Sequence, residues 1–192
     1  MSPLQGIGSE NPSVRLDCFR AFSAMFDFTV LVLPGAWSSS VAITLDVLGA
    51  SAMLAPRLEM PRVKWRVLSP NGGSVPLSSG LHLETGAMPT RSRADASIWI
   101  IPGLGVDRPA ALAGRLMSDD ARRAIESVRR HGARGGQVSA SCSAVFLLQA
   151  AGLLQGRRVT TSWWLAPELR RIEPRCHVDA DRMICADGPI ST

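Results

Sequence analysis

Residues 138–164 read VSASCSAVFLLQAAGLLQGRRVTTSWW. A short run of small and β-branched residues meets a long apolar run, and a cysteine, Cys142, stands at the junction. Ala140 and Ala144 lie two positions before and two positions after it. A sharp turn from strand to helix needs small residues at these places, because its backbone passes close to its neighbours. The stretch therefore predicts a nucleophile elbow at Cys142.

Outward from this stretch, apolar β-branched runs alternate with helical patterns along the chain. The predicted strands are 28–33, 63–68, 97–101 and 137–141, and the predicted helices are 38–55, 110–130 and 143–151. Short extended pieces at 75–77 and 81–83 are expected to form a small flap or hairpin. This alternation predicts an α/β fold, a flavodoxin-like three-layer sandwich around a largely parallel sheet.

Serine and glycine residues indicate where the predicted helices begin and end. Ser38, Ser39 and Ser40 are expected to cap the helix 38–55, and Ser118 is expected to break the helix 110–130 and cap its second part. Gly152 is the expected residue just past the helix that follows Cys142.

The length of 192 residues fits one domain. Residues 1–26 show no sustained period and are interpreted as a poorly ordered leader. The domain is expected to span 27–192 and to lack its C-terminal element.

Composition excludes several classes of protein. We found no signal peptide and no apolar run near the roughly 18–20 residues that a membrane helix needs, so a cytoplasmic protein without membrane contact is expected. The four cysteines are expected to be thiols, and no metal site or cofactor is predicted. The net charge of +5 comes almost wholly from arginine. Its densest cluster is interpreted as a solvated helix face: Arg122, Arg123, Arg129, Arg130 and Arg134.

The central stretch resembles the ThiJ/PfpI superfamily, and within it the GlxA-like regulators of the AraC family. The family pattern is a cysteine elbow, a helix, Ala-Gly-Leu-Leu-x-Gly-Arg-Arg and then Thr-Thr-His-Trp, which residues 151–164 follow closely. The loop 102–105 and the opening 33–35 also fit. The resemblance covers about 28–192 and implies the same α/β fold.

The resemblance also exposes a departure. Enzymes of the superfamily pair the elbow cysteine with an acidic residue of the first loop and with a histidine. Here the corresponding loop, 36–40, holds no carboxylate, Ser143 follows the cysteine, and Ser162 replaces the histidine of the Thr-Thr-His-Trp motif. The three histidines of the chain are interpreted as structural or solvated: His82, His131 and His177.

A binding site is nevertheless expected at the carboxyl ends of the strands. Its predicted members are Ser38, Ser39, Ser40, Gly103, Leu104, Cys142, Ser143, Ser162 and Trp163, with Trp37 as a further wall. The N–H groups of Gly103 and Ser143 are expected to form an oxyanion nest. Hydroxyls beside apolar walls suit a small polar or amide-like ligand.

Three functions remain open from the sequence. The first is a small-molecule-sensing and dimerising domain of an AraC-type transcription regulator, without catalysis, that reaches DNA only through a helix-turn-helix domain absent from this chain. The resemblance implies that the chain is truncated before that domain. The second is a hydrolase or hydratase that uses Cys142. The third is an inactive fragment.

Overall fold

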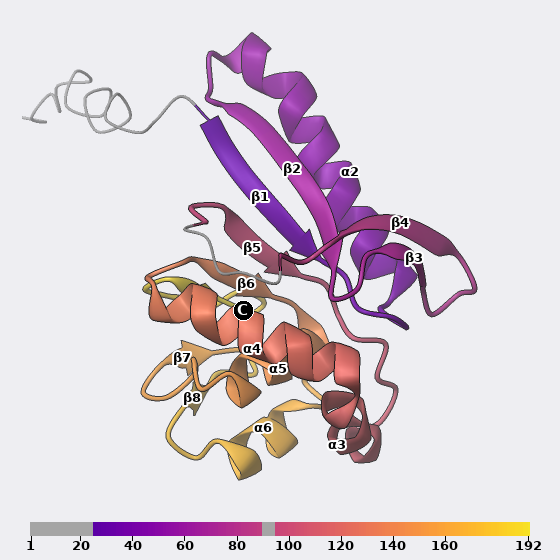
Figure 1. Ribbon diagram of the computed structural model, residues 1–192. Helices are drawn as coiled ribbons and strands as arrows, with labels where there is room; N and C mark the ends of the chain where they lie inside the picture. Colours follow the sequence, from indigo (N-terminus) through magenta and orange to yellow (C-terminus); the bar gives the residue numbers. More distant parts are fainter. Residues whose placement is uncertain (1–24, 90–94) are drawn as a thin grey trace, which may run out of the picture.

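The computed structural model describes residues 25–89 and 95–192, and it confirms the predicted α/β fold (Figure 1). Its main sheet has eight strands. Their spatial order is β3 (Gly73–Pro76), β4 (His82–Ala87), β2 (Arg62–Ser69), β1 (Met25–Leu31), β5 (Ile98–Ile101), β6 (Val138–Ala140), β10 (Ile190–Ser191) and β9 (Ala186–Asp187). The strands from β4 to β10 run parallel to one another, and an antiparallel partner closes each edge. A separate parallel pair joins β7 (Arg158–Val159) to β8 (His177–Val178).

Helices form the layers on the two faces of this sheet (Figure 1). On one face lies α2 (Ser38–Leu54), which continues into the 3-10 turn η1 (Ala55–Leu58). The other face carries α3 (Pro109–Met117), α4 (Asp119–Ala133) and α5 (Val145–Ala150), with α6 (Ala166–Ile172) beyond them. A 3-10 turn, η2 (Cys142–Ala144), leads from β6 into α5.

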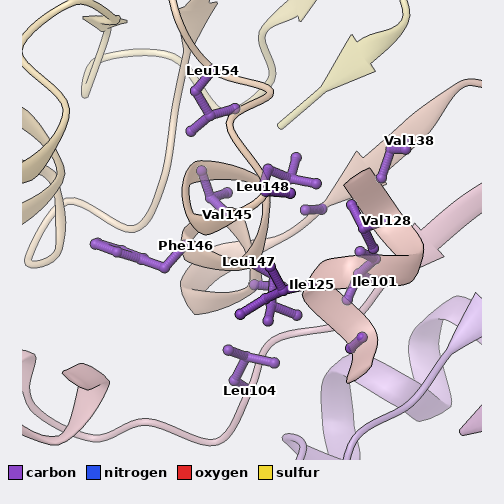
Figure 2. Close-up of a cluster of buried hydrophobic side chains, with 14 of the residues drawn as sticks. Ile101, Leu104, Ile125, Val128, Val138, Val145, Phe146, Leu147, Leu148 and Leu154 are labelled. Atoms are coloured by element: carbon purple, nitrogen blue, oxygen red, sulfur yellow. The ribbon is translucent and has the colours of Figure 1, made fainter. Parts of the chain in front are cut away.

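The alternation of side chains along β1 explains the two layers. Val30 and Val32 join the small core under α2. Leu31 and Leu33 point to the opposite face and join the larger core, which Figure 2 shows between β5, β6, α4 and α5. Because successive strand residues alternate in direction, a continuous apolar run is what a strand covered on both faces requires.

Most element boundaries agree with the sequence. The helix 110–130 breaks at Ser118, as predicted, and the pieces near 75 and 83 pair as the antiparallel hairpin β3–β4. Gly152 has φ +75° just after α5, which confirms its predicted place past the helix end. The first strand begins at Met25 instead of Phe28. Residues 1–24 of the predicted leader lie outside the described residues.

The predicted serine caps were wrong. Neither α2 nor α4 has a side-chain cap, and the residue before α2 is Trp37. The Ser118 hydroxyl instead donates to the carbonyl of Arg115, 2.8 Å away. The hydroxyls of Ser38 and Ser40 bind other loops, because tertiary partners compete for the same oxygen atoms.

The helix α2 corrects a second expectation. Together with η1 it forms a helical segment, Ser38–Leu58, that is long and apolar enough to cross a membrane by length and composition. The sequence predicted a helix that ends at residue 55, three residues before the end of this segment. In the fold, Val41 and Leu48 of this helix pack in the smaller core, so α2 is one layer of the sandwich.

Candidate functional site

Three loops meet where the strand order reverses. The chain runs from β1 outward to β2 and then returns to β5 on the other side of β1. In open α/β sheets this switch point opens a crevice at the carboxyl ends of the strands. The loops after β1 and β5 are joined by a hydrogen bond from the Trp37 N–H to the Gly103 carbonyl, 2.9 Å long. The N–H of Ser141, after β6, donates to Ile101 across 3.1 Å.

Cys142 has the backbone of a nucleophile elbow. Its φ is +54°, and it is one of two non-glycine residues among those described with a positive φ. The left-handed conformation costs an L-residue about 1–2 kcal/mol. Surrounding contacts hold it in place: the Thr161 hydroxyl donates to the Cys142 carbonyl across 2.7 Å, and the Ala144 N–H donates to Ser141. The predicted elbow is present in the structure.

The half-buried sulfur of Cys142 receives a hydrogen bond from Ser162. The Ser162 hydroxyl donates to Sγ, with 2.9 Å between the two atoms. Ser162 occupies the place of the histidine in the Thr-Thr-His-Trp motif. The structure thus places a hydroxyl donor beside the sulfur where the pattern has a base.

The predicted oxyanion nest needs a correction, because its first donor is engaged. The N–H of Gly103 donates to the hydroxyl of Ser40 across 3.1 Å. The hydroxyl of buried Ser143 likewise accepts the N–H of Leu104, 2.9 Å away. Leu104 itself is buried in the larger core and reaches the site only through its backbone. Serine side chains thus satisfy the backbone donors of the second loop.

The rim of the site holds serines that the sequence analysis did not select. Ser38 and Ser79 share a hydrogen bond of 2.6 Å between hydroxyls, and the Ser38 N–H donates to the Ser78 hydroxyl. Ser78 and Ser79 lie in the turn of the β3–β4 hairpin, forty residues away in the chain. On the other side, the hydroxyls of Ser40 and Ser141 lie 3.4 Å apart. Ser39, between Ser38 and Ser40 in the chain, is exposed.

The two tryptophans differ in their surroundings. A Cβ added to Gly103 would lie 3.1 Å from Cδ1 of Trp37 and 3.4 Å from Cβ of Cys142. Because Gly103 has no Cβ, the indole of Trp37 and the side chain of Cys142 can both approach this side of its backbone. Trp163 is 79 % exposed, so a wall function for its ring stays a prediction.

The histidines lie elsewhere in the described structure. His131 is buried, its ring stacks on Trp99 with 4.7 Å between centroids, and its Nε2 lies 3.3 Å from the Gln137 carbonyl. Burial lowers the pKa of this imidazole. His82 and His177 are exposed on β4 and β8. The structural interpretation of His131 agrees with this packing.

Two hollows of the described residues lie away from the cysteine. The larger, about 620 Å³, is at the amino ends of the strands and is lined by residues such as Phe26, Trp99 and His131. The smaller, about 110 Å³, lies beside Pro34 and the turn after β2. Neither includes Cys142. The cysteine site is bordered by serine hydroxyls from three loops.

The family follows from comparison with known proteins. Residues 53–192 match the DJ-1/PfpI family. This chain belongs to the DJ-1/PfpI family. Solved structures of the fold include Drosophila melanogaster DJ-1beta, with 19 % identity over 88 % of this chain and 81 % of that one, and a TM-score of 0.61. An AraC family transcriptional regulator from Pseudomonas putida has a TM-score of 0.65, 16 % identity, and coverage of 86 % and 82 %.

Two curated relatives point in different directions. Isonitrile hydratase of Pseudomonas putida is 32 % identical over 77 % of this chain and 60 % of its own length. The HTH-type transcriptional regulator GlxA of Rhizobium meliloti (strain 1021) is 31 % identical over 80 % of this chain and 43 % of its own length. The chain thus spans about half the length of these relatives, and the family holds both enzymes and regulators.

Proposed function

We propose that this chain is a non-catalytic sensor domain of an AraC-type transcription regulator, which binds a small uncharged polar ligand beside Cys142. One observation carries the proposal: the elbow is intact, but the first loop, 36–40, holds serines and no carboxylate, and Ser162 stands where the family pattern has a histidine. The Ser40 hydroxyl accepts the N–H of Gly103, and the Ser162 hydroxyl donates to the cysteine sulfur. Neither hydroxyl takes a proton at neutral pH as a carboxylate or imidazole does.

The nature of the ligand follows from the groups on the rim. The site residues that hydrogen-bond one another are serine and threonine hydroxyls and backbone amides. Hydroxyls both donate and accept, so they suit amides, alcohols and other neutral polar groups. Similarity to a transcriptional regulator supports the assignment to regulation.

The alternative, a Cys142-dependent hydratase or hydrolase, is favoured by similarity to isonitrile hydratase. The deciding experiment follows conversion of an isonitrile by purified wild-type chain and by Cys142→Ser. We expect equal, background rates for both proteins. Turnover by the wild type that the serine variant loses would make the chain an enzyme and overturn the sensor function. A cooperative thermal unfolding transition of the isolated chain would argue against the inactive-fragment reading.

The DNA-binding half is proposed to lie outside this chain. Sequencing the DNA beyond the codon for Thr192, in all frames, tests this. We expect paired helix-turn-helix segments within about two hundred codons. Unrelated sequence there would remove the link to DNA and leave the domain as a separate sensor.

A further inference from the structure

The larger of the two hollows, here named the amino-end cavity, lies at the edge of the sheet opposite Cys142. Its volume of about 620 Å³ is within the range of small-molecule sites. The stagger of the strands creates it. Phe28 of β1 pairs with Ile98, the first residue of β5, so residues 25–27 of β1 extend past the start of β5. The end of α4 and the turn after it form the opposite side of the cavity.

One wall of the amino-end cavity is apolar. It is formed by side chains of β1, β5 and the segment after β4: Met25, Phe26, Met88, Ile98 and Trp99. The indole of Trp99 is held in two ways, since its Nε1–H donates to Asp95 across 3.0 Å and its ring stacks on His131. A side chain held in this way needs no rearrangement to receive an apolar ligand.

Two glycines leave space at the end of α4. A Cβ added to Gly135 would meet no atom within 4 Å, whereas a Cβ added to Gly136 would overlap the ring of His131. The imidazole therefore packs directly on the Gly136 backbone, and Arg134 is the one residue of the turn 134–136 with a side chain beyond Cα at the cavity. A ligand can approach the backbone of this turn closely.

The wall at α4 carries positive charge through Arg130 and Arg134. Arg130 shares the carboxylate of Glu126 with Arg129, and the nearest nitrogen–oxygen distances are 3.7 Å and 2.7 Å. Arg134 is exposed, and within residues 25–89 and 95–192 it has no carboxylate oxygen within 4.0 Å. This wall thus holds more guanidinium groups than carboxylates.

The two carboxylates that line the cavity do not cancel this charge, because each already has a cation. Asp27 Oδ2 lies 3.2 Å from Nζ of Lys64, and Asp95 Oδ2 lies 2.7 Å from a guanidinium nitrogen of Arg66. Burial lowers the pKa of His131, so its imidazole is neutral near pH 7. The cavity therefore combines an apolar wall with unbalanced positive charge.

We propose that the amino-end cavity binds a small carboxylate with an apolar body, its charged end beside Arg130 and Arg134 and its body against the apolar wall. A guanidinium group matches a carboxylate in shape and charge, since its N–H groups can donate to both oxygens. This site is separate from the one proposed beside Cys142 and does not rest on the proposed function.

The first test titrates the full chain with 2-naphthoate and measures the heat of binding. We expect a dissociation constant below about 1 mM for the wild type. Arg130→Gln and Arg134→Gln should each weaken binding about fivefold, the upper range for a solvated ion pair. The matched control is Arg122→Gln, because Arg122 is an exposed arginine of α4 that does not line the cavity. Its affinity should equal that of the wild type.

The charge of the ligand is tested with 2-naphthamide, which keeps the apolar body and loses the negative charge. We expect the wild type to bind it about fivefold more weakly than 2-naphthoate, and the arginine variants to bind it as the wild type does. Three results would overturn the site: no saturable binding of 2-naphthoate below about 1 mM, equal affinity of the wild type and both cavity variants, or equal affinity for the two compounds.

The place of binding is tested by filling the cavity. Ser127 is a half-buried residue of α4 that lines it, so Ser127→Trp should abolish binding of both compounds. Arg122→Trp is the control outside the cavity, and circular dichroism checks that all variants are folded. A folded Ser127→Trp protein that binds like the wild type would place the ligand elsewhere and reject the site. Cysteine-dependent turnover would reject the sensor function and leave this site intact.

Discussion

The hydroxyl of Ser162 donates a hydrogen bond to the sulfur of Cys142, with 2.9 Å between the two atoms. This pair links the loop after β7 to the elbow after β6, twenty residues earlier in the chain. A hydroxyl that donates to sulfur stabilises the thiolate more than the thiol, because a charged acceptor makes the stronger hydrogen bond. The elbow therefore retains a group that supports the thiolate without a base to relay protons.

Removal of this donor is expected to slow the chemistry of the sulfur. Ser162→Ala should lower the rate of Cys142 alkylation by iodoacetamide about fivefold near neutral pH, equivalent to a hydrogen bond of about 1 kcal/mol. The rate is measured by mass spectrometry of the peptide that contains Cys142. Cys176, whose pKa is raised by burial and by Glu173, serves as the internal control in the same samples. An unchanged Cys142 rate would show that the hydroxyl does not support the thiolate.

The loop after β5 passes close to the loop after β1, and this close approach requires a glycine at position 105. Gly105 has φ +65°, and a Cβ added there would overlap the carbonyl oxygen of Gly35. Gly105→Ala is expected to destabilise the fold by about 3 kcal/mol or more, since backbone strain and a backbone clash combine. Urea unfolding followed by circular dichroism measures the loss.

The matched control is Gly114→Ala, in the helix α3. A Cβ there would meet no atom within 4 Å. Alanine in a helix interior is favoured over glycine by about 0.5–1 kcal/mol. We therefore expect Gly114→Ala to raise the stability. Equal effects of the two substitutions would contradict the loop contact.

Arg115 ties the first loop to the start of α4. Its guanidinium donates to the Pro34 carbonyl across 3.0 Å and forms two hydrogen bonds with the carboxylate of Asp120. Both side chains are more than four-fifths buried. Burial acts to raise the pKa of Asp120, but the hydrogen bonds from Arg115 and Ser118 outweigh it, and the pKa is lowered.

Loss of one partner of this ion pair should lower the free energy of unfolding more than expected from the pair's own contribution, because the other partner stays buried. Arg115→Ala is expected to destabilise by about 2–4 kcal/mol, because it leaves a buried carboxylate without its partner. The double variant Arg115→Ala with Asp120→Ala should lose less than the sum of the two single variants. Denaturant unfolding of the four proteins gives the coupling. Additive losses would mean that the pair contributes no stability of its own.

Whether the sequence predicted a feature of the fold or of the site depended on how far apart in the chain the interacting residues lie. The elbow rests on neighbours two residues from Cys142, and the strand β1 rests on a continuous apolar run, so local patterns predicted both. Ser78 and Ser79 reach Ser38 across forty residues, and no local pattern links them. Arg115 reaches Pro34 across 81 residues. The sequence did not indicate this contact, because an arginine in a helix is most often exposed to solvent.

The apolar face of α2 shows a second limit. Periodicity predicts a buried face only where polar residues mark the other side. In α2, apolar and small residues surround the helix, so the sequence predicted the helix without showing which side the sheet covers. Val41 and Leu48 face the sheet, whereas Ile43 and Val47 face solvent. The exposed side of α2 became visible only in the fold.

A cluster at the amino ends of the strands is expected to make the stability depend on pH. The carboxylate of Asp95 accepts hydrogen bonds from Arg66, Trp99 and the Ser97 N–H. Burial acts to raise its pKa, but these hydrogen bonds outweigh burial and lower the pKa to about 2. Beside it, the ring of His131 stacks on Trp99. Both groups have folded-state pKa values below their ordinary values, His131 because it is buried.

Both shifts make the unfolded chain bind protons at a higher pH than the folded chain, so stability is expected to fall on acidification. The His131 contribution is present above about pH 6.5 and is lost as the pH falls through the lowered pKa. The Asp95 contribution, about 1–2 kcal/mol after allowance for solvent, is lost between pH 3.8 and about 2. Urea unfolding from pH 7.5 to 2.5 should show both steps. His131→Phe should remove the first step and Asp95→Asn the second, and a step that survives its substitution would belong to another group.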